Sequence, residues 1–153
     1  MAKLLISIII CQAAGFFGSF FTRSSVSTWY QTLVKPSFAP PNWLFAPVWI
    51  TIFVMMGISL YLIIKPENGT IINKKALMVF AFQLIFNILW SAAFFGLRSP
   101  LAGLIVISIL WFLILFNIVE FYKISKTAGI LLIPYILWVS FASVLNLEYW
   151  RLN

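Results

Sequence analysis

Five apolar stretches divide this chain, and each is long enough to cross a lipid bilayer as an α-helix, which takes about 20 residues. They lie near residues 4–22, 43–64, 76–95, 101–121 and 128–147. Membrane-spanning β-strands would alternate polar and apolar residues, and these stretches do not alternate. We therefore predict an all-α integral membrane protein, in which residues 1–153 form one domain built as a bundle of five transmembrane helices.

The composition supports a membrane location. Of the 153 residues, 63% are hydrophobic and 8% are charged, and a soluble protein of this size could not cover its surface with so few charges. The net charge of +7 comes from Lys and Arg scattered along the edges of the apolar stretches. Nucleic-acid binding would need a dense basic cluster or a basic helix face. We expect membrane lipid, and no nucleic acid, as a partner of these charges.

The first apolar stretch begins like a secretory signal peptide, because Lys3 precedes the apolar residues 4–10. The apolar character continues to Arg23, so we predict an uncleaved membrane-spanning helix. Five spans place six basic residues on the N-terminal side (Lys3, Lys65, Lys74, Lys75, Lys123, Lys126) and four on the other (Arg23, Lys35, Arg98, Arg151). The positive-inside rule then predicts a cytoplasmic N-terminus.

An aromatic, proline-rich and basic segment, residues 24–42, separates the first two apolar stretches. Proline neither continues a helix nor donates to a sheet, so Pro40 and Pro41 predict a shaped loop. Loops of this length are usually functional or disordered, and Trp29 and Tyr30 argue against disorder. We predict that residues 24–42 form a lid on the helix bundle, with Trp29 and Tyr30 packed inward. The stiff proline pair would lower the cost of ordering this lid around a ligand.

The titratable residues limit the chemistry. The chain has no His, and its single Cys11 cannot form an intramolecular disulfide, so the usual metal and haem ligands are missing and we predict no metal site. Buried acids usually mark ion pathways in membranes. Here Glu120 and Glu148 lie at the ends of apolar stretches and Glu67 lies in a loop. This pattern argues against a proton-coupled pump and leaves passive movement or binding open.

Three of the apolar stretches carry a stripe of residues that contains a tryptophan. The stripes share the spacing i, i+4, i+7, i+8, i+11, which places each on one helix face. They are Trp49, Phe53, Met56, Gly57, Leu60; Gln83, Asn87, Trp90, Ser91, Phe94; and Pro134, Trp138, Phe141, Ala142, Leu145. Such stripes can be helix-packing faces whose amides bond across helices. Because an indole in a pocket can use both its face and its N–H, we favour a shared pocket for the three together.

The remaining residues of note have simpler interpretations. Trp43 and Trp150 lie at span ends, where membrane-interface aromatics are common, and we assign Trp111 to packing or lipid contact. Small residues form two rows in the first stretch, Cys11, Gly15, Ser19 and Ala14, Gly18. Such rows allow close helix approach, either within the chain or in a dimer. Pro134, about two turns into the fifth stretch, predicts a kink.

These residues together resemble the TspO/MBR family, the tryptophan-rich sensory proteins related to the translocator protein. Residues 29–41 match its first-loop motif W-Y-x-x-L-x-K-P-x-x-x-P-P. The helix motifs are matched by Pro47-Val48-Trp49 with Met56-Gly57, by Gln83, Asn87, Trp90-Ser91 and Phe94-Phe95-Gly96, and by Pro134-Tyr135, Trp138, Phe141-Ala142 and Leu145-Asn146. The resemblance covers nearly the whole chain.

The resemblance implies a five-helix membrane protein, often a homodimer, whose first loop closes over a pocket. It implies binding of tetrapyrroles such as protoporphyrin IX or haem, without a covalent cofactor, and in some members of sterols or drug-like ligands. It also implies a bacterial cell membrane as one location. The positions that match ligand contacts are Trp29, Tyr30, Lys35, Pro40, Pro41, Trp49, Phe53, Gln83, Asn87, Trp90, Phe94, Trp138, Phe141, Ala142 and Asn146.

Some members of the family degrade porphyrin in light and oxygen, and Trp49 and Trp138 match the tryptophans involved. The stripes offer no general acid or base, so any breakdown here would be photochemical. Two departures bear on ligand choice: Phe38 and Phe53 stand where many members have Trp and Tyr, and each lacks a hydrogen-bond donor. A loose sterol pattern ends the chain, with Val144 or Leu145 followed by Tyr149 and Arg151.

Two other classes of function remain open. A small-molecule transporter such as a multidrug exporter would also be short and aromatic, but an exporter would need a membrane-buried acid. A structural subunit of a membrane complex would explain the packing stripes, but not a long ordered loop.

Overall fold

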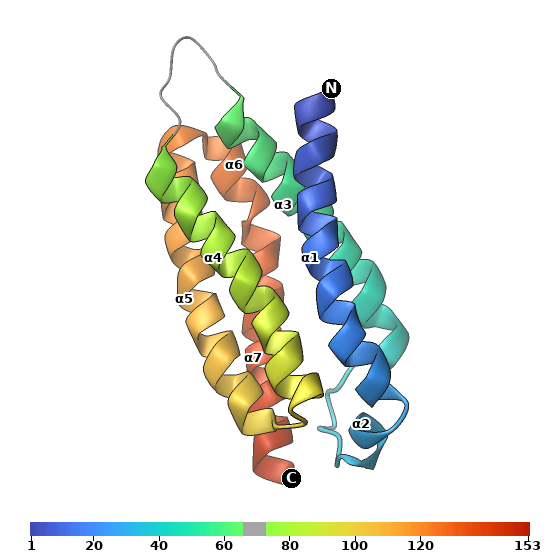
Figure 1. Cartoon of the computed structure of the whole chain (residues 1–153). Helices are drawn as coiled ribbons and strands as arrows, with labels where there is room; N and C mark the ends of the chain where they lie inside the picture. The colour runs from blue at the N-terminus through green and yellow to red at the C-terminus, as the bar shows by residue number, and fades with distance from the viewer. Residues whose placement is uncertain (66–72) are drawn as a thin grey trace.

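The computed structural model describes residues 1–65 and 73–153, and within these ranges every regular element is a helix (Figure 1). Five segments are long and apolar enough to cross a membrane, which confirms the all-α membrane fold. The long helices are α1 (Ala2–Val26), α3 (Phe45–Ile64), α4 (Lys74–Ser91), α5 (Pro100–Ile124) and α7 (Ile133–Leu152). The short ones are α2 (Trp29–Thr32), η1 (Asn42–Leu44), η2 (Ala92–Gly96) and α6 (Lys126–Leu131).

Local side-chain chemistry explains where three of these helices begin. Asn73, Ser99 and Ser125 precede α4, α5 and α6, and each side chain accepts a hydrogen bond from the backbone N–H three residues later. Such caps satisfy N–H groups that have no partner within the helix. Pro100 follows Ser99 in the first turn of α5, where its missing N–H costs nothing.

The fifth span is interrupted at one residue, Leu132, between α6 and α7. α6 ends at Leu131 and α7 begins at Ile133, with Pro134 in its first turn. Proline has no N–H to donate to the preceding turn, which explains why the helix is interrupted here. The irregularity lies beside Pro134, where the sequence predicted a kink.

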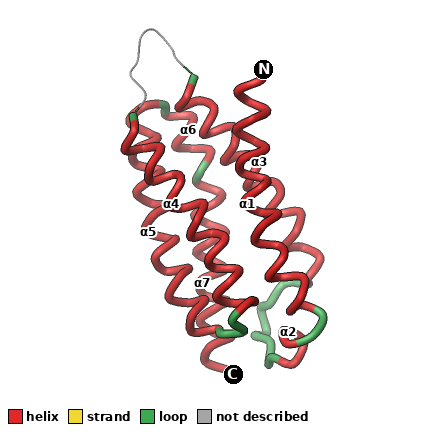
Figure 2. Tube along the Cα trace, viewed as in Figure 1, coloured by secondary structure: helices red, strands yellow, loops and turns green. Residues whose placement is uncertain are grey.

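The lid lies at the same end of the bundle as the C-terminus, opposite the N-terminus (Figure 2). It contains more helix than the sequence predicted, because α1 continues to Val26 and α2 forms a single turn at residues 29–32. Residues 24–42 are therefore only in part an irregular loop.

The small residues of α1 are used within the chain. Cys11, Ala14 and Gly18 are buried, and an added Cβ at Gly15 would lie 2.5 Å from the Phe53 ring in α3. On the α3 side, a Cβ at Gly57 would lie 2.5 Å from the Ile8 Cα. These contacts show the first of the two uses that the sequence left open, because α1 packs closely on α3 through these rows.

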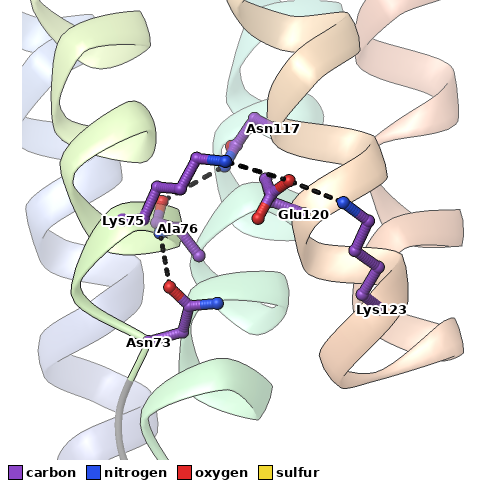
Figure 3. A network of polar contacts seen from close by, with 6 residues as sticks. All are labelled: Asn73, Lys75, Ala76, Asn117, Glu120 and Lys123. Atoms are coloured by element: carbon purple, nitrogen blue, oxygen red, sulfur yellow. Dashed lines mark hydrogen bonds and ion pairs between the residues drawn. The ribbon is translucent and has the colours of Figure 1, made fainter.

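Polar contacts join α4 to α5 at the end of the bundle away from the lid (Figure 3). Glu120 is buried, and its Oε1 lies 2.8 Å from Lys123 Nζ and 3.6 Å from Lys75 Nζ. Asn117 Nδ2 donates to the Ala76 carbonyl at 3.4 Å. Glu120 thus lies one turn before the end of α5, as a paired acid. Glu67 lies outside the described residues.

Candidate functional site

A cavity of about 650 Å³ lies in the lid half of the bundle, and we call it the lid cavity. Its volume is in the range of small-molecule sites, about 300–1,000 Å³. Its walls come from the C-terminal halves of α1 and α4, the first half of α3, and the lid. It is lined by Gln12, Gly15, Phe16, Gly18, Ser19, Thr22, Arg23, Val26, Ser27, Tyr30, Asn42, Phe45, Ala46, Trp49, Ile50, Phe53, Asn87, Trp90, Ser91 and Phe95.

One wall of the lid cavity is aromatic. Trp49 stacks on Phe53, with ring centroids 5.6 Å apart and an interplanar angle of 28°. The ring of Trp90 lies 6.1 Å from that of Trp49, and Phe95 packs edge-on against Trp90 at 6.2 Å. These rings offer an extended apolar surface of the kind on which a flat molecule can stack.

The tryptophans differ in what their N–H groups do. Trp90 Nε1 donates to Asn146 Oδ1 at 3.1 Å, and Trp111 Nε1 donates to Ser140 Oγ at 2.8 Å, so Trp111 packs between α5 and α7. Trp49 Nε1 has no hydrogen-bond partner among the described residues. It also differs from a fully buried atom in that it keeps some exposed surface. The Trp49 N–H is therefore unpaired, on a ring that lines the lid cavity.

The predicted amide residues of α4 and α7 bond across helices. Asn87 Nδ2 donates to the Tyr135 hydroxyl at 2.9 Å, and that hydroxyl donates to Gln83 Oε1 at 2.9 Å. Asn146 Nδ2 donates to the Pro100 carbonyl at 2.7 Å. The packing interpretation therefore holds for Gln83 and Asn146, which are buried behind the aromatic wall. Asn87 does both, since it bonds to α7 and also lines the lid cavity.

The lid is fastened to the end of α7. The Tyr30 hydroxyl lies 2.6 Å from that of Tyr149, and Asn153 forms two hydrogen bonds with the backbone of Val34, one with its N–H at 2.8 Å and one with its carbonyl at 3.1 Å. Lys35 Nζ lies 5.4 Å from the centre of the Tyr30 ring, within cation–π range. Burial raises the pKa of the Tyr30 hydroxyl above its ordinary value of 10.0.

Trp29 and Tyr30 of the lid were both predicted to pack inward, and they do so to different extents. Tyr30 is buried and lines the lid cavity, whereas Trp29 is half-buried and packs edge-on against Phe94 at 5.7 Å. Pro40 and Pro41 lie outside the cavity lining, with Pro41 exposed. Phe38 is exposed and contacts Phe141 at 6.3 Å.

Trp138 does not share a cavity with Trp49, which corrects the hypothesis that the two contact one ligand. Trp138 and Phe141 line a second hollow of about 540 Å³ between α3 and α7, together with Pro47, Val48, Thr51, Ile52, Met55, Pro134 and Leu137. Phe45 lies between Trp138 and the lid cavity, with its ring 5.8 Å from the Trp138 ring.

The physical reason is the register of the fifth-span stripe. The buried face of α7 consists of Tyr135, Val139, Ala142, Leu145, Asn146 and Tyr149. Trp138 lies to one side of this face, because each residue turns the helix by about 100°. From this face, α7 reaches the aromatic wall through Tyr135, whose ring lies 6.2 Å from that of Trp49, and through Asn146, which accepts the Trp90 N–H. Of the predicted stripe, Ala142 and Leu145 belong to the buried face.

The sequence interpretation missed the contribution of α1 to the site. Gln12, Gly15, Ser19 and Thr22 line the lid cavity at spacings of three and four residues, and Arg23 follows them. The spacing of these small and polar residues is visible in the sequence, but we assigned Gly15 and Ser19 only to a packing row and gave Gln12 and Thr22 no role. Gln12 Nε2 also donates to the Ile50 carbonyl at 3.0 Å, which joins α1 to α3 beside the cavity.

Comparison with known proteins identifies the family to which this five-span chain belongs. The sequence profile of the TspO/MBR family matches residues 7–151. The chain belongs to the TspO/MBR family. It is 47% identical over 150 residues to the tryptophan-rich protein TspO of Chlorobaculum tepidum, covering 98% of this chain and 95% of that protein.

Two further relatives span most of the chain. The tryptophan-rich protein TspO of Archaeoglobus fulgidus is 48% identical over 99% of this chain and 97% of its own length. Protein CrtK of Rhodobacter capsulatus is 36% identical over 95% of this chain and 89% of its own length. This TspO/MBR protein is therefore an integral membrane protein, and its relatives are consistent with a sensory or binding role in the membrane.

Proposed function

We propose that this protein is a membrane receptor that binds tetrapyrroles, such as protoporphyrin IX or haem-type porphyrins, and related flat hydrophobic molecules in the lid cavity. The observation that carries the proposal is the aromatic wall of Trp49, Phe53 and Trp90 facing a cavity of about 650 Å³. A macrocycle stacked there would replace water or lipid with aromatic contacts. Stacked aromatic pairs add about 0.5–1.5 kcal/mol beyond the burial of apolar area.

The unpaired groups of the cavity suit a ligand with a few polar atoms. The Trp49 N–H can donate, and Asn87 Oδ1 has no hydrogen bond to a described residue, so it can accept. A largely apolar pocket with a small number of placed polar groups is the usual form of such sites. The lid, closed over the cavity by Tyr30, would hold the ligand away from water.

Light-dependent porphyrin degradation is a second candidate function, and the position of Trp49 favours it. Among the described residues, no His, Asp, Glu or Lys lines the lid cavity, so the side chains that most often act as general acid or base are missing there. A porphyrin excited by light can pass energy or an electron to molecular oxygen, and an oxidisable indole in contact with it can take part. Trp49 and Trp90 face the cavity, whereas Trp138 is separated from it by Phe45.

The relatives support a bacterial cell membrane as the location, and the charge count supports a cytoplasmic N-terminus. The family implies a homodimer. Because Cys11, Ala14 and Gly18 of the α1 rows are already buried within the chain, we expect its interface on another part of the surface.

The test is a titration of the detergent-purified protein with protoporphyrin IX. We expect saturable quenching of tryptophan fluorescence with a stoichiometry near one porphyrin per chain. For Trp49→Phe and Trp90→Phe the readout is the porphyrin absorbance band, because these variants remove an emitter. Both variants should bind more weakly. Trp150→Phe, at an exposed span end, is the matched control and should bind normally. Unsaturable quenching in the wild-type protein, or equal affinity by absorbance in all variants, would exclude the lid cavity as the binding site.

A further inference from the structure

Arg23 is the one charged residue in the lining of the lid cavity, within the part of the chain that the structure describes. It lies in the last turn of α1, and its side chain is exposed at the edge of the cavity. The rest of the lining is aromatic, aliphatic or neutral polar. The cavity therefore combines an apolar wall with a single positive charge.

The guanidinium of Arg23 has no partner in residues 1–65 and 73–153. The two acids described there, Glu120 and Glu148, are occupied by Lys75 and Lys123 and by Arg151. No hydrogen bond joins it to the nearby hydroxyls of Ser19 and Thr22 on α1, which donate to backbone carbonyls of their own helix at 2.7 and 3.4 Å. The planar set of N–H donors on Arg23 is thus unused.

From this we infer that Arg23 binds a carboxylate of the ligand, so that the lid cavity selects flat hydrophobic molecules that carry an acidic group at one edge. Guanidinium and carboxylate form paired, charge-assisted hydrogen bonds with matched geometry. The hydrophobic body would stack on Trp49 and Phe53 while the acid remains at the cavity edge near Arg23. This inference rests on the proposed function and specifies its ligand class.

A purely structural role for Arg23 makes a different prediction. A cation in the last turn of a helix interacts favourably with the helix dipole, and a long basic side chain at a span end reaches toward lipid headgroups. Neither role depends on whether the ligand is an acid. The two explanations therefore separate when the charge of the ligand is removed and its ring system is kept.

The experiment measures the affinity of the full chain for protoporphyrin IX and for its dimethyl ester, in nanodiscs of zwitterionic lipid. The ester keeps the macrocycle and removes both carboxylates. We expect the wild-type protein to bind the diacid about tenfold more tightly than the ester, the size of one charge-assisted hydrogen-bonded contact. Arg23→Gln should lose this preference by weakening diacid binding alone, and Arg23→Lys should restore part of it.

Arg98→Gln is the matched control, because Arg98 is an exposed cation on the lid side that does not line the cavity. It should keep the full preference for the diacid. Equal affinity of the wild-type protein for both porphyrins, or an unchanged preference in Arg23→Gln, would overturn the inference and leave the proposed function intact. Binding of neither porphyrin would overturn both.

Discussion

The hydroxyl oxygens of Tyr30 and Tyr149 lie 2.6 Å apart and join the lid to the last turns of α7. The two residues are 119 positions apart in the sequence, and both side chains are buried. Their rings also contact each other at 5.4 Å, and Phe94 packs against both. Closure of the lid over the cavity therefore depends on the position of α7.

Replacing Tyr149 with Phe should loosen the lid. The substitution keeps the ring but leaves the buried Tyr30 hydroxyl without its partner, which costs about 1–3 kcal/mol. We expect faster protease cleavage within residues 24–42 and a lower melting temperature. Tyr122→Phe, at an exposed side chain in α5, is the control and should leave both unchanged. Wild-type cleavage rates in Tyr149→Phe would mean that the hydroxyl pair does not hold the lid.

The same contact should be insensitive to pH in the physiological range. Because burial raises the pKa of the Tyr30 hydroxyl above 10.0, the closed lid favours the neutral form. A raised pKa gives a stabilisation that is complete below the unfolded-state pKa and declines as the pH rises above it. We expect lid protection, measured by hydrogen exchange corrected for its intrinsic rate, to be constant from about pH 6 to pH 9 and to fall only in stronger alkali. A decline near neutral pH would contradict this assignment.

Trp49 and Trp138 should differ in their effect on porphyrin binding. Trp49→Phe removes the unpaired N–H of a ring that lines the lid cavity, and the loss of one neutral hydrogen bond to the ligand should weaken binding by about 0.5–1.5 kcal/mol. Trp138→Phe should leave the affinity unchanged, because Trp138 lines the other hollow. The rate at which light degrades the bound porphyrin should likewise fall in Trp49→Phe and stay unchanged in Trp138→Phe. Equal losses in both variants would mean that the ligand occupies a site shared by the two indoles, contrary to the structure.

Hydropathy alone predicted the five spans, because a membrane helix must be apolar over its whole length and its ends are marked by charges and prolines. The inward packing of Tyr30 was also predicted from the sequence, because an aromatic side chain in a proline-stiffened loop has few places to pack other than the helix bundle. Helix bounds were less accurate where no charge or proline marks the end, as at Val26.

The partition of the stripes between cavity and core could not be predicted in this way. In a soluble helix the polar face marks the outside, but membrane helices are apolar on every face, and so the inward direction carries little signal. The fifth-span stripe was therefore centred on Trp138, whereas the buried face passes through Tyr135. Whether an amide such as Gln83 faces a ligand or another helix depends on partners from distant parts of the sequence.

The contact between Gly57 and Ile8 gives the sharpest test of the bundle itself. A Cβ at Gly57 would lie 2.5 Å from the Ile8 Cα and 2.9 Å from its backbone nitrogen, so Gly57→Ala forces α1 away from α3. Overpacking of this kind costs about 1–3 kcal/mol.

Gly96→Ala is the matched control, because its Cβ would meet the Phe21 side chain at 2.9 Å and an exposed ring can move aside. We expect thermal unfolding in detergent to shift to lower temperature in Gly57→Ala and to change little in Gly96→Ala. Since α1 also forms one wall of the lid cavity, porphyrin affinity should fall with stability in the first variant alone. Equal stability of the two variants would show that α1 and α3 can separate at no cost, and the close packing described here would not hold.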